Sequence, residues 1–272
     1  MRNFAVCMIV AVGCSTFGCT PTLAGPDHSW DILIFTQHWP NTVCMEWKEK
    51  LKQHTCILPR IKNSWTVHGI WPTKLGTIGP QFCNHSLHFD PEKLQPIRGK
   101  LEQEWLNVYN GTTTSLWKHE WKKHGTCAVT LPALDNETKY FGQGLAWIEK
   151  YNMENVLARA GINPDTKGYS PQQVWDAVHG ALGKTPAVEC VRDSETGNWF
   201  LAEIRICFDK NLTLTDCDGI KRDDASIKTN CPSEKLVIYP GKVPVFQQED
   251  TDRTTWLLSA LRVIQWLQWI TL

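Results

Sequence analysis

The sequence has no excess of charge of either sign, because 28 lysine and arginine residues balance 28 aspartate and glutamate residues among its 272. It also has no internal repeat and no low-complexity segment. With 42% hydrophobic and 21% charged residues, the chain has an ordinary globular composition, which excludes disordered and fibrous classes. A broad basic surface is excluded as well, so any nucleic acid must be bound at a local site.

Cysteine and tryptophan, in contrast, are abundant, with 11 and 14 residues. The tryptophans indicate a large aromatic core or a stacking surface. At the amino terminus, Arg2 precedes an apolar run, residues 4–12, that is too short to span a bilayer, and Thr22–Ala24 is a plausible cleavage site. We therefore expect residues 1–24 to be a signal peptide that directs the protein into the secretory pathway, for export or for the lysosome.

Removal of that peptide would discard three cysteines and leave eight, an even number that indicates four disulfides in a secreted chain. Eight cysteines permit 105 pairings, so their number leaves the connectivity open. Four N-x-[ST] sequons agree with secretion, and a glycosylated one must lie at the surface. Their asparagines are Asn84, Asn110, Asn136 and Asn211.

No linker interrupts residues 25–245, which we expect to form one domain and to act as a monomer. Residues 246–272 differ, because from Thr255 onward the chain is mostly aliphatic and contains three tryptophans. This tail is short for a transmembrane span and carries Arg262. An amphipathic helix on the domain or at a membrane surface and a cleaved lipid-anchor signal are alternatives. The simplest interpretation is a variant terminus without function, and membrane contact has no other support.

Hydrophobic periodicity predicts strands near both ends of the domain and helices between them, which favours an α+β class. We expect Pro72 to stop the second strand and Ser170 to cap the last helix. The predicted strands cover 30–37, 65–71, 199–208 and 236–239, and the predicted helices cover 91–107, 140–160 and 171–182.

Segment 117–127, Trp-Lys-His-Glu-Trp-Lys-Lys-His-Gly-Thr-Cys, concentrates ionisable side chains. Thr114 or Ser115 can cap a helix that starts before it, and Gly125 can end that helix. A helix ending at Gly125 would place the preceding histidine near the negative end of the helix dipole. The dipole would favour the protonated imidazole, so we expect mildly acidic working conditions.

Four ionisable side chains share one side of this predicted helix. With His119 at zero, Lys123 falls at roughly 40°, Glu120 at roughly 100° and His124 at roughly 140°. A lone histidine is usually a hydrogen-bonded core residue. Four titratable groups on one arc are costly to bury as packing, so a functional site is the better interpretation.

Two metal-site interpretations fail on the sequence. His119–Lys123 begins like the zinc-protease motif, but the position of the second histidine holds lysine, and a cation between ligands disfavours a dication. A second apparent cluster consists of Cys83, His85 and His88. In an oxidising compartment we expect Cys83 to form a disulfide, and the sequon beside it places this loop outside.

Phosphodiester transfer uses two histidines, a lysine and a carboxyl group without a metal. One imidazole removes the proton of the attacking hydroxyl and the other protonates the leaving oxygen, while the lysine neutralises charge on phosphorus. His68, on the strand ending near Trp71, can supply the second imidazole beside His124. Trp71 offers an aromatic face to an unpaired base, although most of the tryptophans are expected to be core residues.

His-Gly-Ile-Trp-Pro at 68–72 and the segment at 119–127 resemble the two active-site segments of the ribonuclease T2 family, in its animal type. The similarity covers residues 28–240. Further matching positions are Gln37–Pro40 with Cys44, Tyr140–Gly142, Cys231 and Val237–Pro240.

The resemblance implies a single domain with a central, mainly antiparallel sheet flanked by helices, and an endoribonuclease that acts on single-stranded RNA. His68 would be the general acid for the 5′-oxygen and His124 the general base for the 2′-hydroxyl. Glu120 and Lys123 would stabilise the transition state. The products would be a 2′,3′-cyclic phosphate and then a 3′-phosphate, and neither a metal nor an organic cofactor would be needed.

The resemblance also implies a substrate-binding set in which His119 binds phosphate, Trp71 stacks on a base and Gln37 contacts the substrate. The disulfides that it implies are Cys44–Cys56, Cys83–Cys127, Cys190–Cys231 and Cys207–Cys217. Two positions depart from the family pattern. Thr73 replaces a frequent aspartate, which leaves base preference open, and Leu116 replaces an aromatic residue, which weakens stacking of the downstream base.

Two other functions remain as alternatives. A secreted signalling or cell-surface interaction protein could keep this fold and act without cleavage, but the intact set of ionisable residues argues against that as its sole role. A carbohydrate-binding module would explain the tryptophans. However, the sequence lacks the paired carboxylates of a glycosidase, and the histidine-rich face would have no explanation.

Overall fold

The computed structural model describes residues 28–165, 167–217 and 229–244. The predicted signal peptide and the tail 246–272 lie outside these ranges, so the structure describes neither. Within the described ranges, none of the helices has the length and apolar character needed to cross a membrane.

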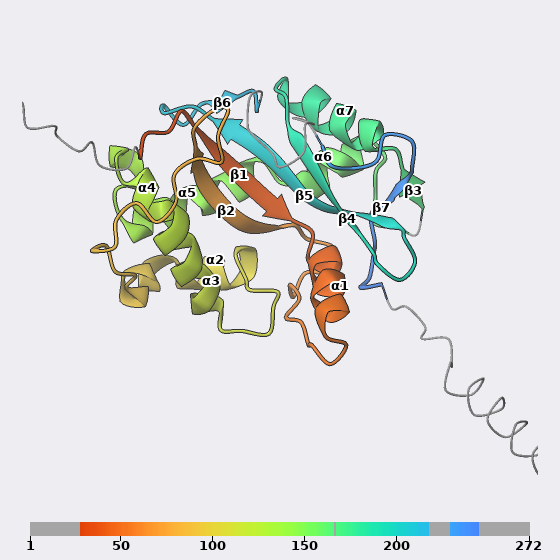
Figure 1. Ribbon diagram of the computed structural model, residues 1–272, viewed down its shortest axis with the longest axis horizontal. Coiled ribbons are helices and arrows are strands. Elements are labelled where there is room, and N and C mark those ends of the chain that lie inside the picture. The colour runs from red at the N-terminus through yellow and green to blue at the C-terminus, as the bar shows by residue number, and fades with distance from the viewer. Residues whose placement is uncertain (1–27, 166, 218–228, 245–272) are drawn as a thin grey trace, which may run out of the picture.

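Among the described residues, seven strands form a central sheet (Figure 1). The longest, β5 (Trp199–Phe208), pairs antiparallel with β1 (Ile32–His38), and β1 pairs antiparallel with β2 (Thr66–Thr73). Two further strands, β4 (Ala187–Arg192) and β6 (Leu214–Thr215), pair antiparallel with β5. The short strand β7 (Val237–Ile238) pairs parallel with β5, and β3 (Gly168–Tyr169) pairs antiparallel with β7. The predicted α+β class with a mainly antiparallel sheet is confirmed.

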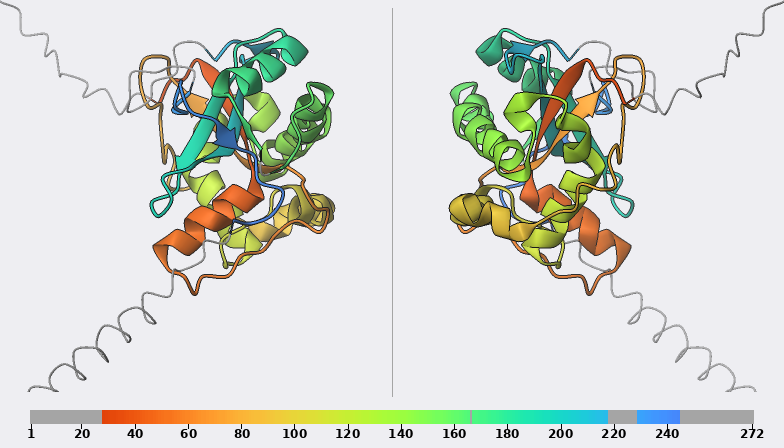
Figure 2. Two further views of the ribbon diagram at one scale, coloured as in Figure 1. Left: turned by 90° about the vertical axis from the view of Figure 1, so that its right-hand side faces the viewer. Right: turned by 90° about the vertical axis from the view of Figure 1, so that its left-hand side faces the viewer.

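Most of the helices lie between β2 and β4 in the chain, and α5 and α6 stand along one side of the sheet (Figure 2). The helical elements are α1 (Pro40–Lys50), η1 (Pro91–Ile97), α2 (Arg98–Glu104), α3 (Thr113–Glu120), η2 (Trp121–Gly125), α4 (Thr126–Ala128), η3 (Pro132–Leu134), α5 (Glu137–Lys150), α6 (Met153–Arg159) and α7 (Pro171–Leu182). Ser170 caps α7 as predicted, in a reciprocal capping box with Gln173.

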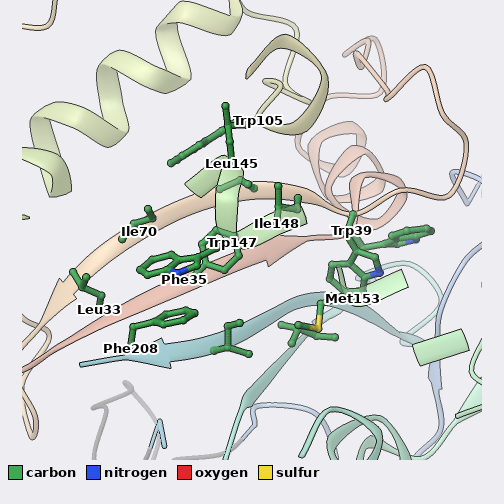
Figure 3. Packing of buried hydrophobic residues seen from close by; sticks show 14 of the residues in the cluster. Leu33, Phe35, Trp39, Ile70, Trp105, Leu145, Trp147, Ile148, Met153 and Phe208 are labelled. Carbon is green, nitrogen blue, oxygen red and sulfur yellow. The ribbon is translucent and has the colours of Figure 1, made fainter. Parts of the chain in front are cut away.

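The main core fills the space between α5 and the sheet (Figure 3). Trp147 of α5 stacks on Phe208 of β5 with ring centroids 3.7 Å apart, and it also contacts Phe35 of β1. Most of the tryptophans in the described ranges are buried, as expected, and several use the indole N–H in a hydrogen bond. Trp39, for example, donates to the Pro240 carbonyl oxygen. One face of the sheet thus carries the main core, whereas the other face carries a smaller buried cluster against which Trp71 packs.

The structure forms four disulfides, in the pairing that the family resemblance implies. The longest loop, of 44 residues, is closed by Cys83–Cys127, and the pair Cys190–Cys231 closes one of 41 residues. The pairs Cys44–Cys56 and Cys207–Cys217 close shorter loops.

Three expectations about local structure were wrong. Pro72 does not stop the second strand but lies inside β2, where an edge strand tolerates its missing N–H. The helix predicted over 91–107 is a 3₁₀-helix followed by the short α2, because Pro96 interrupts the regular hydrogen bonding. The helix predicted over 140–160 is divided into α5 and α6, because Asn152 caps a new helix start.

Candidate active site

A β-bulge in β2 displays the first predicted histidine. The consecutive residues Thr36 and Gln37 of β1 pair with Gly69 and Val67, so His68 has no partner in β1. β2 thus contains one residue more than its neighbour requires. An additional residue of this kind reverses the alternation of side chains along a strand.

The reversal puts His68 and Trp71 on the same face of the sheet, although residues three apart in a regular strand point to opposite faces. Val67 and Ile70 are fully buried in the main core, whereas His68 and Trp71 are only half-buried. The Trp105 indole N–H donates to the His68 carbonyl oxygen at 2.9 Å and so holds the bulge from the core side.

The second predicted segment forms a continuous helical rod of α3, η2 and α4, in which η2 is π-helical. The Thr126 N–H donates to the Trp121 carbonyl oxygen, five residues back. A π turn contains more residues than an α turn, so His119 and His124 lie closer in angle than a regular α-helix would place them. Such turns occur frequently at functional sites.

Gly125 does not end this helix, so the prediction that it would was wrong. Its backbone is helical, with φ −57° and ψ −42°, and the chain continues into α4. Glycine is required for packing, because a Cβ at this position would collide with the Trp121 ring. The expected placement of His124 at a helix C-terminus, and the dipole argument built on it, therefore do not hold.

Trp71 lies next to both of the predicted catalytic histidines. Its ring centroid is 5.1 Å from that of His68 and 5.4 Å from that of His124. The Trp71 indole N–H donates to Glu120 Oε2 at 3.0 Å. Gly69 allows this approach, since a Cβ there would collide with both Glu120 Oε2 and Trp71 Nε1. Two strand residues and two helix residues, distant in sequence, thus form one cluster.

The two histidines have opposite electrostatic surroundings. Burial lowers the pKa of His68, but the Glu203 carboxylate, through its charge and its hydrogen bond, and the Glu120 carboxylate together raise it more, so the net shift is upward. The pKa of His124 is lowered well below its ordinary value, first by burial and then by the positive charges of Lys123 and His68. Below the raised pKa and above the lowered one, His68 is protonated while His124 is neutral.

Glu120 is almost completely buried, at 1% exposure, and burial raises its pKa to about 7. The charges of His68 and Lys123 and the hydrogen bond from Trp71 oppose that rise. Glu120 therefore exchanges a proton near neutral pH. His119 is exposed at the edge of the cluster, where burial and then the Lys123 charge lower its pKa.

The loop between β2 and η1 is attached to the π turn and to α4, at one point each. The Phe82 N–H donates to the Lys123 carbonyl oxygen at 2.9 Å, and the next residue, Cys83, is bonded to Cys127 in α4. This arrangement fixes the turn that carries Lys123 and His124. It also agrees with the interpretation of Cys83 as a disulfide residue. No group of His, Cys, Asp or Glu side chains in the described ranges has the arrangement of a metal site.

Gln37 does not join this cluster. Its side chain is fully buried, its amide nitrogen donates to the Tyr151 carbonyl oxygen at 2.7 Å, and its amide oxygen accepts from the Met153 N–H at 3.4 Å. It holds the junction of α5 and α6 on the core side of the sheet. Of the two departures from the family pattern, Thr73 is buried with its hydroxyl donating to the Trp71 carbonyl oxygen, and Leu116 packs against the core.

Three ionisable residues beside His68 were missed by the sequence analysis. The ring of His38 lies 5.3 Å from that of His68, and β5 contributes Glu203 and Arg205 to the same face. Burial lowers the pKa of His38 to about 3, so it is neutral. A signal for the two β5 residues was present, because they are charges two residues apart in an otherwise apolar strand and thus share a face.

Comparisons with known proteins agree with the geometry. A model of the Ribonuclease T2 family matches residues 30–217. The chain is 40% identical over 215 residues to Ribonuclease Oy of Magallana gigas, which covers 78% of this chain and 96% of that protein. Its structure is similar to that of human RNase T2, with a TM-score of 0.63 and 30% identity over 78% of this chain and 99% of that one. It is also similar to ribonuclease MC1 from bitter gourd seeds, with a TM-score of 0.65 and 27% identity over 77% of this chain and 100% of that one. The chain therefore belongs to the ribonuclease T2 family.

Proposed function

We propose that the protein is an endoribonuclease that cleaves single-stranded RNA by transphosphorylation, with His124 as general base and His68 as general acid. The observation that carries the proposal is that both imidazoles lie next to one indole, with ring centroids 5.1 and 5.4 Å from that of Trp71, in opposite electrostatic surroundings. An acid and a base whose environments separate their pKa values are the pair that this reaction needs.

In the first step, neutral His124 removes the proton of the ribose 2′-hydroxyl, and the 2′-oxygen attacks phosphorus. The bond from phosphorus to the 5′-oxygen breaks as protonated His68 donates its proton to that oxygen. The products are a 2′,3′-cyclic phosphate and a free 5′-hydroxyl. In the slower second step the roles reverse: His68 deprotonates water, His124 protonates the 2′-oxygen, and a 3′-phosphate forms.

The remaining members of the cluster stabilise the charge that develops on the phosphoryl oxygens. Lys123 supplies a cation, and Glu120, with its pKa of about 7, supplies a hydrogen bond to an equatorial oxygen in its protonated form. His119, at the exposed edge, binds the phosphate. The half-buried Trp71 ring, whose N–H is already used by Glu120, offers its remaining surface to a base.

The chemistry and the covalent framework together support a protein of the secretory pathway, exported or lysosomal. Its four disulfides require an oxidising compartment. Three of the four sequon asparagines, Asn84, Asn110 and Asn211, are exposed, while Asn136 is half-buried and caps α5. We propose that glycans are attached at the exposed three.

End-group analysis of a mixed-sequence RNA after incubation with the protein tests this function. We expect cyclic phosphate ends first, 3′-phosphate ends later, and the same activity in the presence of EDTA. Replacement of His68 or His124 by alanine should lower kcat/KM by about 100- to 10,000-fold, the usual contribution of a general acid or base. The control is His179→Ala, an exposed histidine on α7. Activity that EDTA abolishes and zinc restores, or that survives both substitutions, would refute the proposal.

A further inference from the structure

Glu203 of β5 makes the shortest polar contact of His68. His68 Nδ1 lies 2.6 Å from Glu203 Oε1, and the two side chains are 33% and 14% exposed. The register places Glu203 opposite His38 of β1, on the same face of the sheet as the catalytic cluster. With Nδ1 held in this way, the other ring nitrogen, Nε2, is left for the substrate.

The Glu203 carboxylate is held by Arg205, which in turn is held by Glu189. The second oxygen of Glu203, Oε2, accepts hydrogen bonds from Arg205 Nη2 at 2.8 Å and Nε at 3.2 Å. Arg205 Nη1 in turn lies 3.3 Å from Glu189 Oε1 of β4. The guanidinium also lies 5.1 Å from the centroid of the Trp71 ring. These side chains are mostly buried, and buried charges persist only when they are paired.

We propose that Glu203 is the positioning residue of the general acid: it orients the His68 ring through Nδ1 and favours its protonated form for donation to the 5′-oxygen. This inference rests on the function proposed above. During cleavage the proton leaves from Nε2 of His68, and the Glu203 carboxylate accepts the Nδ1–H hydrogen bond before and after the transfer. Glu203 itself takes no proton, as with the orienting carboxylate of a catalytic triad.

The charged groups around His68 favour its protonated form on balance. From β5, Glu203 favours the protonated imidazole and Arg205 opposes it; from α3, Glu120 favours it. From β1 the buried His38 is neutral, and from the helical rod the positive charge of Lys123 lowers the pKa of His124. Burial raises the pKa of Glu203, but Arg205 and His68 lower it far more, so it is ionised throughout the working range. Glu203 is thus the main source of the upward pKa shift of His68.

Glu203→Gln tests the proposal, because it keeps the size of the side chain and removes its charge. On a dinucleoside phosphate we expect kcat/KM at neutral pH to fall about 10- to 100-fold, the range for carboxylates that orient a functional histidine. The alkaline limb of the pH profile should move to lower pH. Glu203→Asp, which restores the charge on a shorter side chain, should recover part of the activity. The matched control is Glu195→Gln, an exposed carboxylate paired with Lys52.

A substrate with an activated leaving group separates positioning of the acid from general damage to the site. A 4-nitrophenyl ester of uridine 3′-phosphate needs little protonation of its leaving group, so Glu203→Gln and His68→Ala should each retain much more activity on it than on the dinucleoside phosphate. Equal losses on both substrates for Glu203→Gln, with the selective loss preserved for His68→Ala, would overturn the role of Glu203 alone. Equal losses for His68→Ala would overturn the proposed function itself.

NMR titration of the His68 ring supplies a readout that does not depend on turnover. The proposal requires a His68 pKa above the ordinary histidine value in the native protein and a lower one in Glu203→Gln. If that variant does not fold, the same titration in Glu203→Ala, which also removes the charge, takes its place. An unchanged His68 pKa in a folded variant would refute the proposal.

Discussion

Replacement of Gly69 by alanine adds one methyl group and removes no chemical function, yet we expect it to lower the activity strongly. The Cβ would occupy space held by Glu120 Oε2 and Trp71 Nε1, which are hydrogen-bonded to each other at 3.0 Å. Non-bonded heavy atoms prefer separations of about 3.5–4.0 Å, so one partner must retreat by about 1 Å. That displacement breaks the hydrogen bond between them.

The size of the effect follows from the two groups involved. A hydrogen bond contributes about 0.5–1.5 kcal/mol between neutral groups and about 1.5–3 kcal/mol to an ionised one, which corresponds to roughly a 2- to 100-fold loss in rate if the bond is needed in the transition state. A displacement of about 1 Å in an active site has a similar cost. The overpacked site should also lower the free energy of unfolding by about 1–3 kcal/mol.

Steady-state kinetics on a dinucleoside phosphate and urea denaturation measure the two effects in Gly69→Ala. Gly99→Ala is the matched control, because a Cβ at that position in α2 meets nothing within 4 Å. We expect the control to keep full activity and to be slightly more stable, since alanine restricts the unfolded chain and favours a helix. Wild-type kcat/KM and unfolding free energy in Gly69→Ala would refute the packing argument and the role of the Glu120–Trp71 contact.

Two further predictions concern pH and the disulfide beside the site. His68 must be protonated and its pKa is raised, while His124 must be neutral and its pKa is lowered, so we expect kcat/KM to be constant around the ordinary histidine pKa and to fall at higher pH as His68 loses its proton and at lower pH as His124 gains one. The Glu120→Gln variant lacks the group that titrates near 7, and an acid limb above the ordinary histidine pKa in its pH profile would contradict this assignment. Replacing Cys83 and Cys127 by alanine should lower the free energy of unfolding by about 4 kcal/mol for a loop of this length, against about 3 kcal/mol for the control pair Cys44 and Cys56. At temperatures where both variants are folded, only the loss of Cys83–Cys127 should lower kcat. Equal kcat values in the two variants would show that this bond does not position His124.

The sequence was sufficient to predict the clustering of His68 with Glu120, Lys123 and His124, because two short and highly specific segments carry these residues. It was also sufficient for the long strand β5 and for α7, whose periodicity and cap are regular. These signals are local, because each is carried by one short segment of the chain.

Features that depend on distant packing could not be predicted. The β-bulge at His68 is defined only by the partner strand, and the continuation of the helix through Gly125 depends on how the Trp121 ring packs. The contact of Glu203 with His68 joins residues 135 positions apart. Gln37 shows the opposite error: it matches a family segment, but its side chain points to the core side of β1.

Because of the bulge in β2, catalytic activity depends on the number of residues in this strand as well as on the chemistry of its side chains. A shortened strand without Val67 could pair evenly with β1, and the imidazole would then turn toward the hydrophobic interior while the domain kept its architecture. A homologue could therefore retain every reactive side chain of this site and still be inert, through the loss of a single spacer residue. Inspection of aligned motifs alone would not reveal such a protein, whereas the number of residues that β2 places opposite β1 would.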